Sequence, residues 1–199
     1  MLIFKDIIAW ICSRKRSPQQ SANGPAPTLQ SCLPSSVPKS TAAPSVSAKP
    51  TSELLPGNWK ADPRTEKNLL TLEPITAKLV RELVRRLQAE GLNFKVTSAT
   101  RTWDEQNALY NQRPKVTNAR AGYSWHNFGL AADLTLFDKS GRKPIWEGPQ
   151  YNRIGAIAKE LGLEWGGSWR TFKDLPHVQR NIGLTLAQAR AKYPGGIIA

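Results

Sequence analysis

Residues 124–133 read SWHNFGLAAD and place His126 seven residues before Asp133. This spacing does not match one face of a helix, where neighbouring side chains are three or four residues apart. We expect His126 to lie in a loop that leads into a strand carrying Asp133. Gly129 and the small alanines that follow it would allow close backbone packing at this junction. The stretch therefore predicts a loop–strand unit around which the fold is organised.

The chain has only two histidines, and each lies near an acid in the sequence. The second, His177, follows Asp174 by three residues. Two imidazoles and one carboxylate make up the three protein ligands of a catalytic zinc, which keeps its fourth position open for water. We therefore predict that His126, Asp133 and His177 bind Zn²⁺. The alternative is that both histidines are structural, because the spacing lacks the sharpness of a helical His-Glu-x-x-His motif.

Two further charged residues fit the chemistry of such a site. A carboxylate beside a metal can take a proton from an attacking water and return it to the leaving group. Asp174 is the candidate for this general acid/base, since it stands three residues before His177. A developing oxyanion also needs positive charge beyond the metal. Arg101, which follows a predicted strand ending at Ser98, is the candidate for that role.

Composition divides the chain into three parts. Residues 1–13 have apolar side chains at helical spacing, followed by a basic run at residues 14–16. They predict a short amphipathic segment that contacts an anionic membrane through residues 1–16. A poorly ordered terminus, or a helix packed on a partner, is the alternative. Residues 14–53 are rich in Ser, Pro and Ala and predict a linker, and residues 54–199 predict the catalytic domain.

The expected elements of residues 54–199 favour an α+β fold over a doubly wound parallel sheet. Helices and strands alternate irregularly, and the strands are few and short. We expect a single compact domain with a small, mostly antiparallel sheet flanked by helices. Its predicted helices cover residues 75–87, 103–110, 151–161 and 185–192, and its predicted strands cover residues 93–98 and 129–137 and a segment near 177–179.

The formal net charge of +13 favours a polyanionic partner, such as nucleic acid, an anionic membrane or an anionic cell wall. No aromatic–basic stacking pattern or groove-reading helix supports nucleic acid, so we expect none as a partner. The only cysteines, Cys12 and Cys32, lie outside the predicted domain. The domain therefore has no disulfide framework and no cysteine-based metal site.

The order Ser124-x-His126-x-x-Gly129-x-Ala131-x-Asp133, followed by Asp174-x-x-His177, resembles the zinc peptidases of the VanY/VanX type. This family includes D-alanyl-D-alanine carboxypeptidases and the L-alanyl-D-glutamate endopeptidases of phage endolysins and bacterial autolysins. The endopeptidase branch is the closer match. It is indicated by SATRT at residues 98–102, by VTNA at 116–119 and by WGGSW at 165–169. The resemblance runs from about residue 70 to residue 178.

The resemblance implies a zinc enzyme that cuts the peptidoglycan stem peptide between L-Ala and D-Glu, and we expect this enzyme to be a monomer. It implies the same roles for the residues named above, and it adds Ser124, Gln106 and Trp169 as substrate-binding residues. A D-alanyl-D-alanine carboxypeptidase, or a non-catalytic cell-wall-binding module, is the alternative. The target would be the cell envelope, reached either by a phage lysis protein or by a membrane-associated bacterial wall enzyme.

Overall fold

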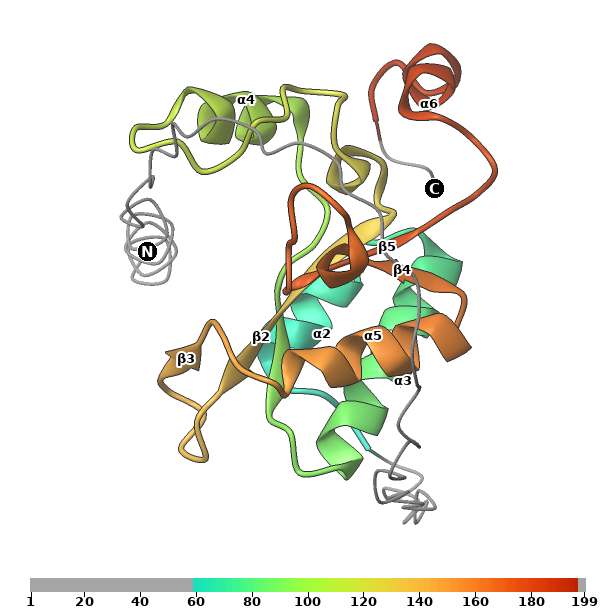
Figure 1. Cartoon of the computed structure of the whole chain (residues 1–199). Coiled ribbons are helices and arrows are strands. Elements are labelled where there is room, and N and C mark those ends of the chain that lie inside the picture. The colour runs from blue at the N-terminus through green and yellow to red at the C-terminus, as the bar shows by residue number, and fades with distance from the viewer. Residues whose placement is uncertain (1–58, 197–199) are drawn as a thin grey trace, which may run out of the picture.

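The computed structural model describes residues 59–196 (Figure 1). The predicted amphipathic segment, its membrane contact and the predicted linker lie outside these residues. Within this range, no helix is long and apolar enough to cross a bilayer. The helices are α2 (Pro63–Leu69), α3 (Pro74–Ala89), α4 (Trp103–Asn111), α5 (Tyr151–Glu160) and α6 (Leu186–Lys192), with the short 3-10 helices η1 (Trp125–Phe128) and η2 (Gly166–Ser168). The strands are β1 (Phe94–Ser98), β2 (Ala131–Phe137), β3 (Pro144–Ile145), β4 (Leu163–Trp165) and β5 (His177–Arg180).

The strands form one antiparallel sheet in the order β1-β2-β5-β4, with β3 paired to β2. The α+β prediction with a small antiparallel sheet is therefore confirmed. The predicted helices and strands appear close to their expected bounds. The structure adds α2, β3 and β4, which are seven, two and three residues long. Strands of two or three residues, such as β3 and β4, have too few positions to show a hydrophobic period in the sequence. In α2 only Thr65 and Leu69 are buried, so this helix has no apolar stripe.

The two faces of the sheet have different tasks. Successive side chains of a strand point to opposite faces, and one face packs against α3 and α5 in the main core. Figure 1 shows these two helices together on one side of the molecule. The core-facing residues of the two central strands are Ala132, Leu134, Leu136 and Val178. The residues between them, Asp133 on β2 with His177 and Gln179 on β5, therefore point to the other face.

A second, smaller apolar cluster packs α6 against the segment that includes η1. Its buried members are Phe128, Leu130 and Ala189. Arg190 on α6 donates a hydrogen bond of 3.1 Å to the carbonyl oxygen of Gly122, just before η1. A Cβ on Gly196 would lie 2.3 Å from the carbonyl oxygen of Asn127. The C-terminal part of the described chain thus holds the turn that contains His126.

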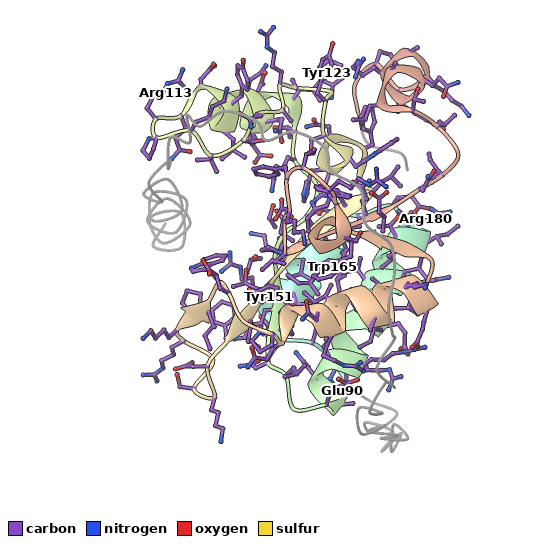
Figure 2. The ribbon with its side chains drawn as sticks, in the orientation of Figure 1. Glu90, Arg113, Tyr123, Tyr151, Trp165 and Arg180 are labelled. Atoms are coloured by element: carbon purple, nitrogen blue, oxygen red, sulfur yellow. The ribbon has the colours of Figure 1, made fainter. Side chains whose placement is uncertain are left out.

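The indole of Trp165, labelled in Figure 2, lies between Gly155 of α5 and Gly167 of the WGGSW motif. A Cβ on Gly155 of α5 would come within 2.2 Å of this ring, and a Cβ on Gly167 within 2.1 Å. The other glycine of the motif, Gly166, faces the backbone of Asp174, whose carbonyl oxygen would lie 2.6 Å from a Cβ at that position. The indole N–H donates to the carbonyl oxygen of Leu175 at 2.7 Å. Trp165 therefore fixes the loop that leads into β5 and His177.

Replacing Gly155 with alanine tests this packing. In an ordinary helix interior this change stabilises by about 1 kcal/mol. Here we expect the free energy of unfolding to fall by about 1–3 kcal/mol, because the added methyl group displaces Trp165. Chemical denaturation of the two proteins measures the difference.

The exposed neighbour Ala156 offers a control for helix propensity alone. Ala156→Gly should cost about 1 kcal/mol. If Gly155→Ala raised the stability by a similar amount, the proposed constraint on Trp165 would be wrong.

Candidate metal centre

Two of the predicted ligands face each other across neighbouring strands. Asp133 on β2 and His177 on β5 are Cα partners in the antiparallel ladder. Directly opposed residues in such a pair project to the same face with their Cβ atoms about 4.5–5.5 Å apart. The pairing of β2 with β5 therefore brings together two residues that are 44 positions apart in the sequence.

The third predicted ligand, His126, lies in the short helix η1 just before β2. The side chain of Ser124 caps this helix by accepting the backbone N–H of His126 at 3.4 Å. Gly129 ends it with a φ of 72°, a left-handed conformation that glycine adopts without strain. A Cβ at Gly129 would also lie only 3.0 Å from the backbone nitrogen of Glu73. Glycine therefore allows the sharp turn between His126 and the strand.

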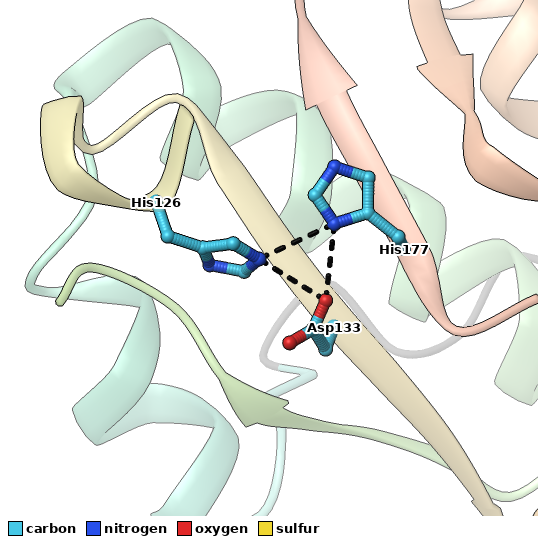
Figure 3. Close-up of side chains that lie close together, drawn as sticks. All are labelled: His126, Asp133 and His177. Carbon is cyan, nitrogen blue, oxygen red and sulfur yellow. Dashed lines mark hydrogen bonds and ion pairs between the residues drawn. The ribbon is translucent and has the colours of Figure 1, made fainter. Parts of the chain in front are cut away.

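The three side chains converge on a small triangle of ligand atoms (Figure 3). The distance from His126 Nε2 to Asp133 Oδ1 is 3.1 Å. The distances from His177 Nδ1 to His126 Nε2 and to Asp133 Oδ1 are both 3.2 Å. A tetrahedral ion with ligands at 2.0–2.2 Å separates them by roughly 3.3–3.6 Å. The donor set and its spacing therefore fit a divalent metal.

A hydrogen bond from Nδ1 of the His126 ring determines which ring nitrogen has a lone pair free for a metal. Its Nδ1 lies 2.6 Å from the carbonyl oxygen of Ala99, and this contact is buried. A carbonyl oxygen only accepts, so Nδ1 carries the proton and Nε2 presents a lone pair to Asp133 and His177. A metal in the triangle would therefore meet the lone pair of His126 on Nε2.

The charges around the triangle favour the metal-binding forms of His126 and Asp133 but the protonated form of His177. Burial, and next the positive charge of Arg101, lower the pKa of His126 to about 4. Burial would raise the pKa of Asp133, but His126 and Arg101 outweigh it and hold this pKa well below its usual value. Burial would lower the pKa of His177, but the hydrogen bond and charge of Asp133 outweigh it, so the net shift is upward. A metal ion would compete with that proton on His177.

Arg101 contacts the carboxylate oxygen of Asp133 that lies away from the histidines. Its guanidinium donates to Asp133 Oδ2 at 2.6 Å and to Ser98 Oγ at 2.8 Å. The candidate for oxyanion stabilisation therefore lies directly beside the triangle. Its side chain keeps 19% of its surface exposed, so it also borders solvent.

The loop before β5 places Asp174 next to His177. The backbone N–H of Asp174 donates to the carbonyl oxygen of Gly166 at 3.1 Å, and its carbonyl oxygen accepts the N–H of His177 at 3.2 Å. The negative charge of Asp174 contributes to the raised pKa of His177. The predicted acid/base thus stands beside the predicted ligands.

The residues expected to bind substrate differ in their surroundings. Trp169 packs its ring 5.2 Å from that of His177. Ser124 caps the His126 turn, as described above. Gln106 is fully buried; its amide donates to the carbonyl oxygen of Ala119 at 2.8 Å, and Arg101 approaches its Oε1 at 3.5 Å. In this structure Gln106 therefore supports Arg101 and the loop, and its contact with substrate stays a prediction.

Sequence reasoning missed two polar residues of this face, Gln179 and Glu164. Gln179 Oε1 lies 3.0 Å from His177 Nε2, and Glu164 contacts Gln179 from β4. One signal was present in the sequence. A polar residue two positions after a histidine in a strand lies on the same face as that histidine.

A buried group of two imidazoles and a carboxylate, with an arginine and a second acid beside it, has the residue types of a metal-dependent hydrolase. A family model described as D-alanyl-D-alanine carboxypeptidase matches residues 117–180. The peptidoglycan L-alanyl-D-glutamate endopeptidase CwlK of Bacillus subtilis is 39% identical over 122 residues, which cover 54% of this chain and 72% of that protein. The chain therefore belongs to the peptidase M15 family, whose members are metallopeptidases.

Two further similarities extend over comparable parts of the chain. The L-alanyl-D-glutamate peptidase of Listeria phage A118 is 30% identical over 121 residues, or 59% of this chain. The chain spans 41% of the length of that phage protein. The crystal structure of the Serratia marcescens L-Ala D-Glu endopeptidase ChiX has a TM-score of 0.47 and 24% identity, and the match covers 66% of this chain and 91% of that one.

Metal-dependent stabilisation tests the triangle directly. A divalent metal at 100 times its Kd should add about 2.7 kcal/mol to the free energy of unfolding. This corresponds to a rise of several degrees in Tm for a chain of this size. Asp133→Ala should abolish the rise, because it removes one ligand.

Asp138→Ala is the matched control, since it removes a half-buried carboxylate just beyond the end of the same strand, one that, within the described residues, accepts hydrogen bonds only from its own turn. It should keep the full metal-induced rise in Tm. An equal rise in the Asp133→Ala protein would contradict the site.

Proposed function

We propose that this chain is a zinc-dependent peptidoglycan hydrolase that cuts the stem peptide between L-Ala and D-Glu. The observation that carries the proposal is the triangle formed by His126, Asp133 and His177, in which both histidines are buried. The bond is suggested by two relatives whose names specify L-alanyl-D-glutamate cleavage. The net charge of +13 suits an anionic wall polymer.

Zinc is the proposed ion because its usual ligands and geometry match the site. Imidazole nitrogen and carboxylate oxygen are both common zinc ligands, and three of them leave a fourth tetrahedral position open. In our proposal His126 binds through Nε2, His177 through Nδ1 and Asp133 through Oδ1. When bound, zinc supplies Lewis-acid chemistry, since it polarises the scissile carbonyl and makes a water molecule acidic enough to attack it.

Asp174 is the proposed general acid/base. Its carboxylate would accept a proton from the attacking water and then deliver that proton to the leaving amine of D-Glu. The backbone contacts of Asp174 with Gly166 and His177 support this assignment, because they hold it beside the ligands. The nearby Trp165 indole restrains the same loop through Leu175.

Arg101 is proposed to stabilise negative charge that develops on the scissile carbonyl oxygen. Its contact with Asp133 Oδ2 supports a second task, that of orienting the carboxylate so that Oδ1 faces the histidines. In the proposal, Ser124 and Trp169 border the bound stem peptide. Gln106 would act through its contact with Arg101.

One observation favours a second activity. The family model that matches residues 117–180 is described as a D-alanyl-D-alanine carboxypeptidase. That enzyme class would use the same triangle and acid but would release a terminal D-Ala. A non-catalytic wall-binding module remains the third alternative, and measured turnover separates it from both enzymes.

The proposed setting is the cell envelope. The enzyme would reach the wall either as a phage lysis protein or as a membrane-associated bacterial enzyme, acting as a monomer. Contact of residues 1–16 with an anionic membrane stays a prediction, because these residues lie outside the described range.

Asp174→Ala tests the acid/base assignment. We expect kcat on purified muropeptides to fall by about 10²- to 10⁴-fold, the usual contribution of a positioned acid or base. Zinc affinity should stay unchanged, because Asp174 is not a proposed ligand. Asp138→Ala should leave both quantities unchanged. Normal turnover by Asp174→Ala would remove this residue from the mechanism.

Mass spectrometry of the products tests the bond. The proposed endopeptidase splits the stem peptide next to L-Ala, so the glycan fragment keeps only L-Ala. A carboxypeptidase releases single D-Ala and leaves the rest of the stem intact. If the zinc-loaded protein left muropeptides uncut, the enzymatic proposal would fail.

A further inference from the structure

A chain of hydrogen bonds leads from His177 across the polar face of the sheet to β4. His177 Nε2 lies 3.0 Å from Gln179 Oε1. The amide nitrogen of Gln179 donates to Glu164 Oε2 at 3.0 Å. Gln179 and Glu164 are Cα partners in the β4–β5 ladder, so their backbones hold the two side chains opposite each other. The other carboxylate oxygen, Glu164 Oε1, accepts the indole N–H of Trp169 at 2.5 Å.

The direction of each bond follows from the residue types. The indole nitrogen of Trp169 only donates, and both oxygens of the Glu164 carboxylate accept. Gln179 must therefore turn its NH₂ group toward Glu164 and its Oε1 toward His177. Because an amide oxygen only accepts, His177 Nε2 must carry a proton. In the neutral form of His177, which is the form that can bind a metal, the lone pair is then left on Nδ1, the atom that faces Asp133 and His126.

The opposite tautomer of His177 would be unsuitable for the centre. It would place an N–H on Nδ1, where it would point at the proposed metal position. A ligating histidine usually has its other ring nitrogen bound to a partner that fixes the tautomer, and loss of such a partner typically costs 10- to 100-fold in metal affinity. Ala99 supplies this partner for His126. On the His177 side the partner is a side chain whose own orientation depends on Glu164.

We propose that Glu164 and Gln179 are positioning residues that fix the tautomer of His177 so that Nδ1 binds the metal. Trp169 donates to Glu164 Oε1 and packs its ring beside His177. We call the hydrogen-bonded chain Trp169–Glu164–Gln179–His177 the relay. The relay rests on the proposed metal site. The register between β4 and β5 places Glu164 opposite Gln179. In this proposal, that register therefore determines which ring nitrogen of His177 carries the proton.

Glu164→Gln reverses the relay without changing the size of the side chain. The new amide turns its oxygen to Trp169 and its NH₂ group to Gln179. Gln179 must then turn its own oxygen toward residue 164 and its NH₂ group toward His177 Nε2. This arrangement favours the tautomer with the proton on Nδ1. We expect the zinc Kd, measured by competition with a chelator of known affinity, to rise by about 10- to 100-fold.

The double variant Glu164→Gln with Gln179→Glu restores the original direction. The oxygen of the new amide at position 164 accepts the indole N–H of Trp169, and its NH₂ group donates to the new carboxylate at position 179. That carboxylate accepts a hydrogen bond from the Nε2–H of His177. We expect zinc affinity to return to within a few-fold of wild type. Glu160→Gln, which changes an exposed glutamate of α5, is the control and should leave zinc affinity unchanged. Thermal unfolding of the metal-free proteins separates loss of affinity from loss of folding.

Nitrogen NMR shifts of the histidines in the metal-free protein provide an independent measurement. We expect a protonated Nε2 on His177 in wild type and a protonated Nδ1 in Glu164→Gln. Equal zinc affinity and the same tautomer in both proteins would overturn the relay. If wild type bound zinc no better than Asp133→Ala did, the proposed metal site would fail, and the NMR comparison would still decide the relay.

Discussion

The pairing of Asp133 with His177 across β2 and β5 is the interaction on which the site depends. It sets the register of the two central strands so that one face presents the proposed ligands and the opposite face enters the core. A shift of β5 by one residue would turn His177 into that core and would expose Val178, while Asp133 stayed on the opposite face. Apolar and site residues alternate along β2 and β5. Packing of the apolar residues in the core therefore also brings the site residues together.

The polar face is costly to build, and the structure offsets that cost locally. Placing an arginine, a carboxylate and two imidazoles together takes polar groups out of water. Each of these groups has a partner: Ser98 and Asp133 for Arg101, Ala99 for His126 and Gln179 for His177. Such complete hydrogen bonding also restricts the side chains to one arrangement, as preorganised sites require.

Glycines allow close packing at the two loops that carry site residues, the one before β2 and the one before β5. Gly129 lets the chain reverse between His126 and β2, next to the backbone of Glu73. Gly155 and Gly167 leave room for the Trp165 indole, which holds the loop before His177. These contacts explain why the sequence around the ligands is rich in small residues. The small residues allow the packing, and the proposed chemistry rests on the histidines and acids.

The sequence by itself determined the α+β class, the longer helices and strands, and the small set of acids and histidines from which a site could be made. These features are local, because periodicity, helix punctuation and residue type can be read within a short window. Convergence of His126 with His177, 51 residues later, and the contact between Gln179 and His177 were decided only by the tertiary structure. Strand register creates those contacts, and register depends on packing between distant segments rather than on neighbouring residues.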